Sequence, residues 1–119
     1  MKITIEKLLR SKSVVEKLMR SEMPAAAAYD VMKMARAIGE ELKLFEQARK
    51  NLFEKYGEEN KETKNVQIKD ENVEVFKTEM SDLMKKEVEL KCQVLKVQAL
   101  ADVKMSVVDL MIMEGLIEE

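Results

Sequence analysis

One long apolar stripe constrains this chain more than any other feature of the sequence. Between about Ser21 and Tyr56, apolar residues recur at alternating spacings of three and four, which is the period of an amphipathic helix. Pro24 fits the first turn, where its missing N–H costs nothing, and Gly57 follows as a left-handed stop. The stripe comprises Ala28, Val31, Ala35, Ile38, Leu42, Phe45, Leu52 and Tyr56.

The predicted helix is too long for the domain that carries it. With 119 residues we expect a single domain, 1–119. A compact domain of that length should be roughly 35 Å across, whereas the helix should be roughly 50 Å long at 1.5 Å per residue. One end of the helix must therefore protrude, or another chain must cover it.

A second helix, about 72–86, is predicted after the polar segment 57–65, which has the composition of a solvated loop. Asp70 or Asn72 can cap it. It should return antiparallel to the first, giving a long helical hairpin. Its inward residues are Val73, Phe76, Met80, Leu83 and Met84. A shorter helix is predicted near the N-terminus at 11–21, capped by Ser11 or Ser13.

The stretch EVELKCQV, residues 87–94, decides the fold class. Charged or polar residues alternate strictly with apolar ones, which favours a strand. Its candidate partners are the alternating segment 1–5 and the segment 66–68. A helical interpretation also fits, through Leu90, Val94, Val97 and Ala101. We therefore expect an α+β fold: a long antiparallel helical hairpin, a small sheet with strands near 1–5, 66–68 and 87–97, and a C-terminal helix. The alternative is an all-α helical bundle.

The C-terminal helix, predicted over 107–119 after a Ser106 cap, is apolar nearly all round. Such a helix is either buried on several sides or docked against another subunit. Methionine lines adaptable binding surfaces because its flexible side chain repacks easily, and the chain has ten methionines. The candidate interface residues are Met32, Met34, Met111, Met113 and Leu116. The alternative is that the methionines simply fill the core of the chain.

Arg49 interrupts the apolar stripe of the long helix, and Glu87 would interrupt a second stripe if 87–97 were helical. These two residues are a candidate pair that fixes the register of the helices, although a buried pair adds little net stability. The alternative is that both side chains simply reach water.

The composition argues against catalysis. The chain has no histidine, which removes the commonest general base and metal ligand, and Cys92 is its only cysteine. No phosphate-binding glycine loop and no metal-ligand spacing occurs. We therefore expect no catalytic residue, no metal and no cofactor, and hence no enzyme.

Charge and hydropathy bound the location and the partners. A net charge of −2 gives no global reason to expect nucleic acid. The first 20 residues are locally basic, which leaves a DNA-binding regulator as one alternative. The sequence shows neither a membrane-spanning apolar run nor a signal peptide, and a lone cysteine suits a reducing compartment. We expect a cytoplasmic protein without membrane contact.

Three segments resemble a group of small proteins encoded by phages and prophages of Gram-positive bacteria. They are MPAAAAYDVMKMARAIGEELKLFEQARKNLFEKYG (23–57), FKTEMSDLMKKEVEL (76–90) and MSVVDLMIMEGLIEE (105–119). The resemblance implies a phage-encoded accessory or assembly protein in the bacterial host cytoplasm, and it brings no activity.

Together these features predict a non-enzymatic interaction or assembly protein. It would act through helix-mediated self-association, as a homo-oligomer, or through binding of another protein. The alternatives are a small phage inhibitor of a host protein and the DNA-binding regulator.

Overall fold

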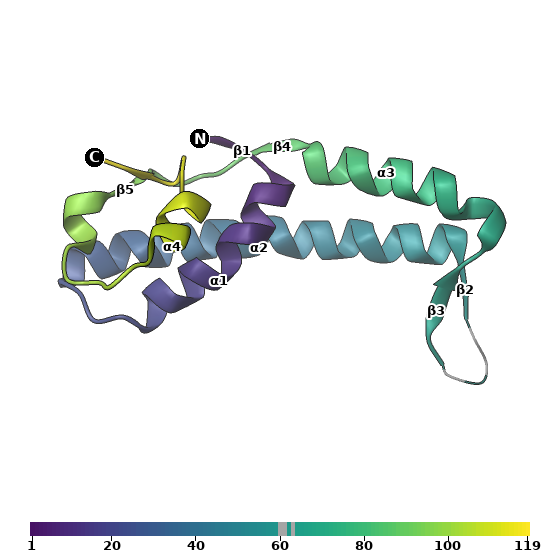
Figure 1. Ribbon diagram of the computed structural model, residues 1–119, viewed down its shortest axis with the longest axis horizontal. Helices are drawn as coiled ribbons and strands as arrows, with labels where there is room; N and C mark the ends of the chain where they lie inside the picture. The colour runs from purple at the N-terminus through teal and green to yellow at the C-terminus, as the bar shows by residue number, and fades with distance from the viewer. Residues whose placement is uncertain (60–61, 63) are drawn as a thin grey trace.

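The computed structural model describes residues 1–59, 62 and 64–119, and it shows an elongated molecule (Figure 1). Its extents are 52 × 28 × 24 Å and its Cα radius of gyration is 17.5 Å, against about 13.5 Å for a compact domain of this length. The unbroken helix α2, Ala25–Tyr56, runs along the whole long axis. The apolar stripe therefore predicted this helix correctly.

The end of α2 differs from its prediction. Gly57 has φ −101° and ψ 170°, which is extended backbone and not the expected left-handed stop. The reason for glycine here is space: a Cβ would lie 2.5 Å from the backbone oxygen of Phe53 and 2.7 Å from Cγ1 of Val66. The chain can leave the helix in this direction only because position 57 has no side chain.

The predicted helical hairpin is present. After α2, strand β2 (Gly57–Glu59) pairs antiparallel with β3 (Val66–Ile68), so part of the predicted loop 57–65 is a strand. Residues 60, 61 and 63 of that prediction lie outside the described residues. A 3-10 turn, η1 (Asp70–Asn72), leads into α3 (Val73–Lys85), which returns along α2 (Figure 1).

The N-terminal helix is longer than predicted. Helix α1 spans Ile5–Arg20 rather than 11–21. Its cap is Thr4, whose Oγ1 accepts a hydrogen bond from the Lys7 backbone N–H at 3.2 Å. Ser11, expected as a cap, is buried within the helix and donates its hydroxyl to the Leu8 carbonyl at 2.9 Å.

In the described part of the chain, the strands form three separate two-stranded pairs, where the sequence predicted one small sheet. Strand β1 (Lys2–Thr4) pairs antiparallel with β4 (Glu87–Glu89), as expected for two of the three segments. Segment 66–68 pairs with β2 instead. The fold is thus mixed α and β and mostly helical, and the all-α alternative is wrong.

The predicted strand 87–97 is interrupted. Its first part, β4, ends at Glu89, which lies opposite Lys2 at the start of β1. The chain then bends at residues 91–92 and forms β5 (Leu95–Lys96), which pairs in parallel with β6 (Ile117–Glu118). A 3-10 helix, η2 (Val97–Leu100), follows β5. The partner strands, rather than the alternating pattern, set these lengths.

The C-terminal helix, α4, is short. It spans Val107–Ile112, and Ser106 caps it as predicted. The chain then turns through Gly115, whose φ of +90° suits glycine, and returns to β5 as β6. The expected continuation of the helix to the end of the chain is therefore wrong.

The core lies at one end of the molecule, which we call the wide end. The wide end comprises α1, the first half of α2, α4 and the strands β1, β4, β5 and β6. The opposite end, which we call the arm, comprises the described residues from 46 to 85. None of the described arm residues is fully buried. The arm is held by half-buried contacts, including the Phe53 and Phe76 rings with centroids 5.1 Å apart. Helix α1, which packs against the hairpin, belongs to the wide end.

Candidate interaction surface

Helix α4 begins with a complete capping box. The Ser106 hydroxyl accepts a hydrogen bond from the Asp109 backbone N–H at 3.0 Å, and the Ser106 N–H donates to Oδ2 of Asp109 at 3.2 Å. These bonds satisfy N–H groups that a helix start otherwise leaves without partners. They define where so short a helix begins.

The inner side of α4 combines an apolar anchor with a charge. Met113, at the end of the helix, is completely buried, and Ile112 packs partly buried against the same core. Asp109 is the charged residue on this side: its Oδ2 accepts a hydrogen bond from Nζ of Lys17, on α1, at 2.7 Å. The helix is therefore held against α1 by one ion pair and by its apolar end.

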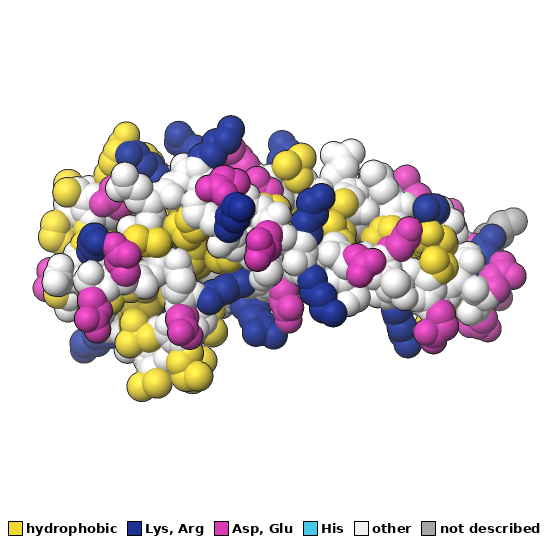
Figure 2. All heavy atoms as spheres, turned by 90° about the horizontal axis from the view of Figure 1, so that it is seen from above, with side chains coloured by type: hydrophobic (Ala, Val, Ile, Leu, Met, Phe, Trp, Pro, Cys, Tyr) yellow, Lys and Arg dark blue, Asp and Glu magenta, His cyan; other side chains and the backbone are white. Residues whose placement is uncertain are grey.

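The outer side of α4 is entirely apolar and faces solvent. Four side chains form it: Val107, Val108, Leu110 and Met111, which are 74%, 62%, 46% and 67% exposed, respectively. We call these four side chains the α4 face. Figure 2 shows hydrophobic side chains gathered at the wide end, whereas the arm carries many charges of both signs. An ordinary surface helix turns its polar residues to water, so the polarity of α4 is inverted.

The electrostatics of Asp109 support this arrangement. The hydrogen bond from Lys17 lowers the pKa of Asp109 below its ordinary value, and the backbone hydrogen bond from Ser106 adds to the effect. The carboxylate is thus ionised at neutral pH, where it holds α4 in place. The α4 face is presented by a helix whose orientation is fixed.

A groove of about 510 Å³ lies beside the α4 face, between α4 and the start of α1. Val108, Met111 and Ile112 form its apolar wall. The opposite side is polar, and Arg10 and Glu6 pair there at 2.8 Å. The remaining lining residues are Thr4, Lys7 and Glu114. The ridge of exposed α4 side chains and this groove form one continuous surface.

The structure divides the predicted interface residues into two groups. Met111 and Met32 are exposed, so their side chains are available to a partner. Met34, Met113 and Leu116 are completely buried in the core of the chain itself, and they offer no surface. Val107, Val108 and Leu110 belong to the surface although they were not predicted individually. The sequence feature that indicated these residues was that the predicted C-terminal helix is apolar on nearly all sides.

The predicted register pair is not formed. Nη1 of Arg49 lies 3.1 Å from Oε2 of Glu46 on the same helix, and its guanidinium stands over the Phe53 ring at 5.3 Å. Glu87 is exposed in β4, opposite Thr4 of β1. The two residues cannot meet because 87–89 is a strand paired with the N-terminal segment.

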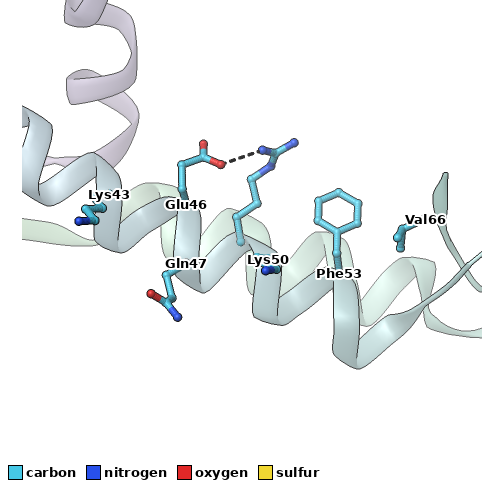
Figure 3. Close-up of a pocket in the computed structure, with 7 residues that line it drawn as sticks. Lys43, Glu46, Gln47, Lys50, Phe53 and Val66 are labelled. Carbon is cyan, nitrogen blue, oxygen red and sulfur yellow. Dashed lines mark hydrogen bonds and ion pairs between the residues drawn. The ribbon is translucent and has the colours of Figure 1, made fainter. Parts of the chain in front are cut away.

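Arg49 instead borders a second shallow groove, of about 500 Å³, on the arm. Figure 3 shows Glu46 and Phe53 extending from the same side of α2, with Val66 of β3 at the far end. Lys43, Gln47 and Lys50 complete the lining. Four of its seven lining residues are charged, whereas none of the four residues of the α4 face is.

Two further observations concern metal binding and a reactive thiol, neither of which the sequence predicted. In the described ranges, no three His, Cys, Asp or Glu side chains come together where they could hold a metal ion. Cys92 is half-buried, and this burial raises the pKa of its thiol, which disfavours the nucleophilic thiolate.

The basic N-terminal segment is partly neutralised within the chain. Arg10 pairs with Glu6 and Lys17 pairs with Asp109. Two cations of this segment are therefore engaged in intramolecular ion pairs, which lowers the charge available to a phosphate backbone.

Comparisons with protein-family models, with curated proteins and with solved structures found no match. Among the described residues, none of the helices is both long enough and apolar enough to span a membrane.

Proposed function

We propose that this chain is a non-enzymatic interaction protein that acts by docking the α4 face onto a protein surface. The observation that carries the proposal is the inverted polarity of α4: its charged residue points inward to an ion pair, and its four outward residues are apolar. Scattered exposed apolar residues are normal, but a contiguous group on one helix marks an interaction site.

The biological setting follows from the resemblance to small phage and prophage proteins. In that setting the chain serves phage assembly, or another step of the phage programme, in the cytoplasm of the bacterial host. The elongated shape supports an assembly role, because the wide end can bind while the arm extends away from it. An inhibitor of a host protein would use the same apolar surface against a different partner.

The test is the replacement of Met111 by lysine. A lysine placed in a desolvated interface should weaken binding by about 2 kcal/mol or more, which is on the order of 30-fold in affinity. Light scattering and native mass spectrometry measure the mass of two preparations. One is the purified protein, and the other is the protein isolated with its partners from cells of a Gram-positive host. The wild type should occur in a complex heavier than one chain of 13.7 kDa, and Met111→Lys should release the single chain.

The matched control is Leu44→Lys on α2, because Leu44 is 65% exposed and is not among the residues that line the groove beside the α4 face. It introduces the same charge and should leave the complex intact. A wild type that stays a single chain in both preparations, or equal loss of the complex in both variants, would contradict the proposal.

A further inference from the structure

We infer that the occupant of the α4 face is a second copy of this chain, paired with the first around a two-fold axis. The inference rests on the proposed function and names the partner. In such a dimer the same patch occurs on both sides, so the patch must be complementary to itself in shape, in charge and in area.

The shape of the surface meets this requirement. The α4 face is a ridge, and the groove of about 510 Å³ lies directly beside it, with Val108 and Met111 belonging to both. When two such surfaces meet antiparallel, the ridge of each copy lies in the groove of the other. Neither copy needs to change its shape, because the capping box and the ion pair of Asp109 already hold α4 in position.

The charges around the groove also meet the requirement that the patch be complementary to itself. The polar lining of the groove contains two anions and two cations: Glu6, Glu114, Lys7 and Arg10. A patch of one sign would repel its own copy, because like charges placed together across an interface oppose binding. Glu6 and Arg10 already pair within one copy, and the four charges of this rim sum to zero, so two copies can meet here without net repulsion.

The area of the α4 face and its groove also suits a dimer. Four aliphatic side chains with these exposures offer roughly 400 Å² of apolar surface, which is within the range of the largest patches on single chains. A stable pair needs roughly 600–800 Å² from each partner. The groove residues, with the aliphatic stems of Lys7 and Arg10, can supply the remainder. The α4 face is then the apolar centre of the interface and the groove is its polar rim.

The geometry specifies which residues meet. Val107 and Met111 are the two most exposed residues of the face and lie one helical turn apart. Antiparallel pairing around a two-fold axis between them brings Val107 of one copy against Met111 of the other, and the reverse contact is its equivalent. Parallel pairing would instead bring each residue against its own counterpart.

The test uses disulfide formation between single-cysteine variants. Cys92→Ser removes the only native thiol, and Val107→Cys and Met111→Cys are then made separately in that background. Mixing the two variants under mild oxidation should give a heterodimeric disulfide at least about tenfold faster than either variant alone gives a homodimer. Native mass spectrometry of the purified wild type should show twice the chain mass of 13.7 kDa.

Two results would overturn the inference, and they differ from failure of the proposed function. Faster crosslinking of each variant with itself would exclude the antiparallel pair. A purified wild type that is a single chain at all concentrations, yet is recovered in a Met111-dependent complex with one other protein, would show that the face binds a different partner. Only the absence of any Met111-dependent complex would remove the proposed function as well.

Discussion

Gly39, inside α2, and Gly57, the first residue after it, have opposite requirements. At Gly57 a Cβ would meet a backbone oxygen at 2.5 Å, whereas at Gly39, inside α2, nothing lies within 4 Å of the added atom. Gly57→Ala should therefore lower the free energy of unfolding by about 1–3 kcal/mol, the usual cost of overpacking. Gly39→Ala should raise it by about 0.5–1 kcal/mol, because glycine is unfavourable inside a helix.

Urea unfolding of both variants, made in the Met111→Lys background, checks this prediction without interference from association. A Gly57→Ala protein as stable as its parent would show that β3 does not pack against the end of α2 as described.

Asp109 predicts a pH dependence of stability. Its pKa in the folded protein lies below the ordinary value, so the folded state binds fewer protons than the unfolded chain at acidic pH. The contribution of Asp109 is therefore fully present above the unfolded pKa of about 3.9, and it is lost as the pH falls through the folded pKa. Asp109→Asn should remove this part of the dependence.

The measurement is the urea midpoint of both proteins from about pH 6 to about pH 3, where Asp titrates. The advantage of the wild type over Asp109→Asn should shrink as the pH falls. Other groups, such as Glu89, whose pKa is also lowered, are present in both proteins and cancel in the difference. An advantage that is constant with pH would show that the ion pair with Lys17 is not formed.

At the scale of elements, the two halves of α2 should differ in local stability. All but one of the buried residues of α2 lie in its first half and the last, Phe45, lies shortly after it, whereas no described residue from 46 to 85 is fully buried. Backbone amides of the arm should therefore exchange with deuterium faster than those of α1 and of the first half of α2. Hydrogen exchange followed by mass spectrometry checks this, and uniform protection along α2 would contradict it.

The elements that the sequence predicted well are those whose signal is local. The periodicity of α2 and α3 depends on residues within the same helix, so their bounds were close. The alternating segment at the N-terminus was placed almost correctly as β1. Helix α1 was predicted too short because Thr4, its cap, lies inside the segment assigned to a strand.

Features that depend on distant partners could not be obtained in this way. Alternation from Glu87 to Val94 carries no information about the length of β1, which ends β4 at Glu89. Similarly, a methionine in an apolar segment does not reveal its direction: Met111 faces solvent and Met113, two residues later, is buried. The α4 face required the structure, because the inner side is the one that places Met113 in the core and Asp109 beside Lys17.

At the scale of the whole molecule, the dissociated chain should remain elongated. Small-angle X-ray scattering of Met111→Lys should give a radius of gyration near or slightly above the 17.5 Å of the Cα atoms, because hydration adds to it. A compact chain of this length would give about 13.5 Å. The smaller value would mean that the arm folds back onto the wide end in solution.

The position of the hairpin of β2 and β3, at the far end from α4, has a consequence for valency. Two chains joined at their wide ends would display two such tips, each carried on its own arm. A ligand with repeated sites for this hairpin, such as a polymer of identical subunits, would then be held by both hairpins at once. A weak contact at each tip would become a firm attachment through effective concentration, and severing the pair would abolish it without altering either tip.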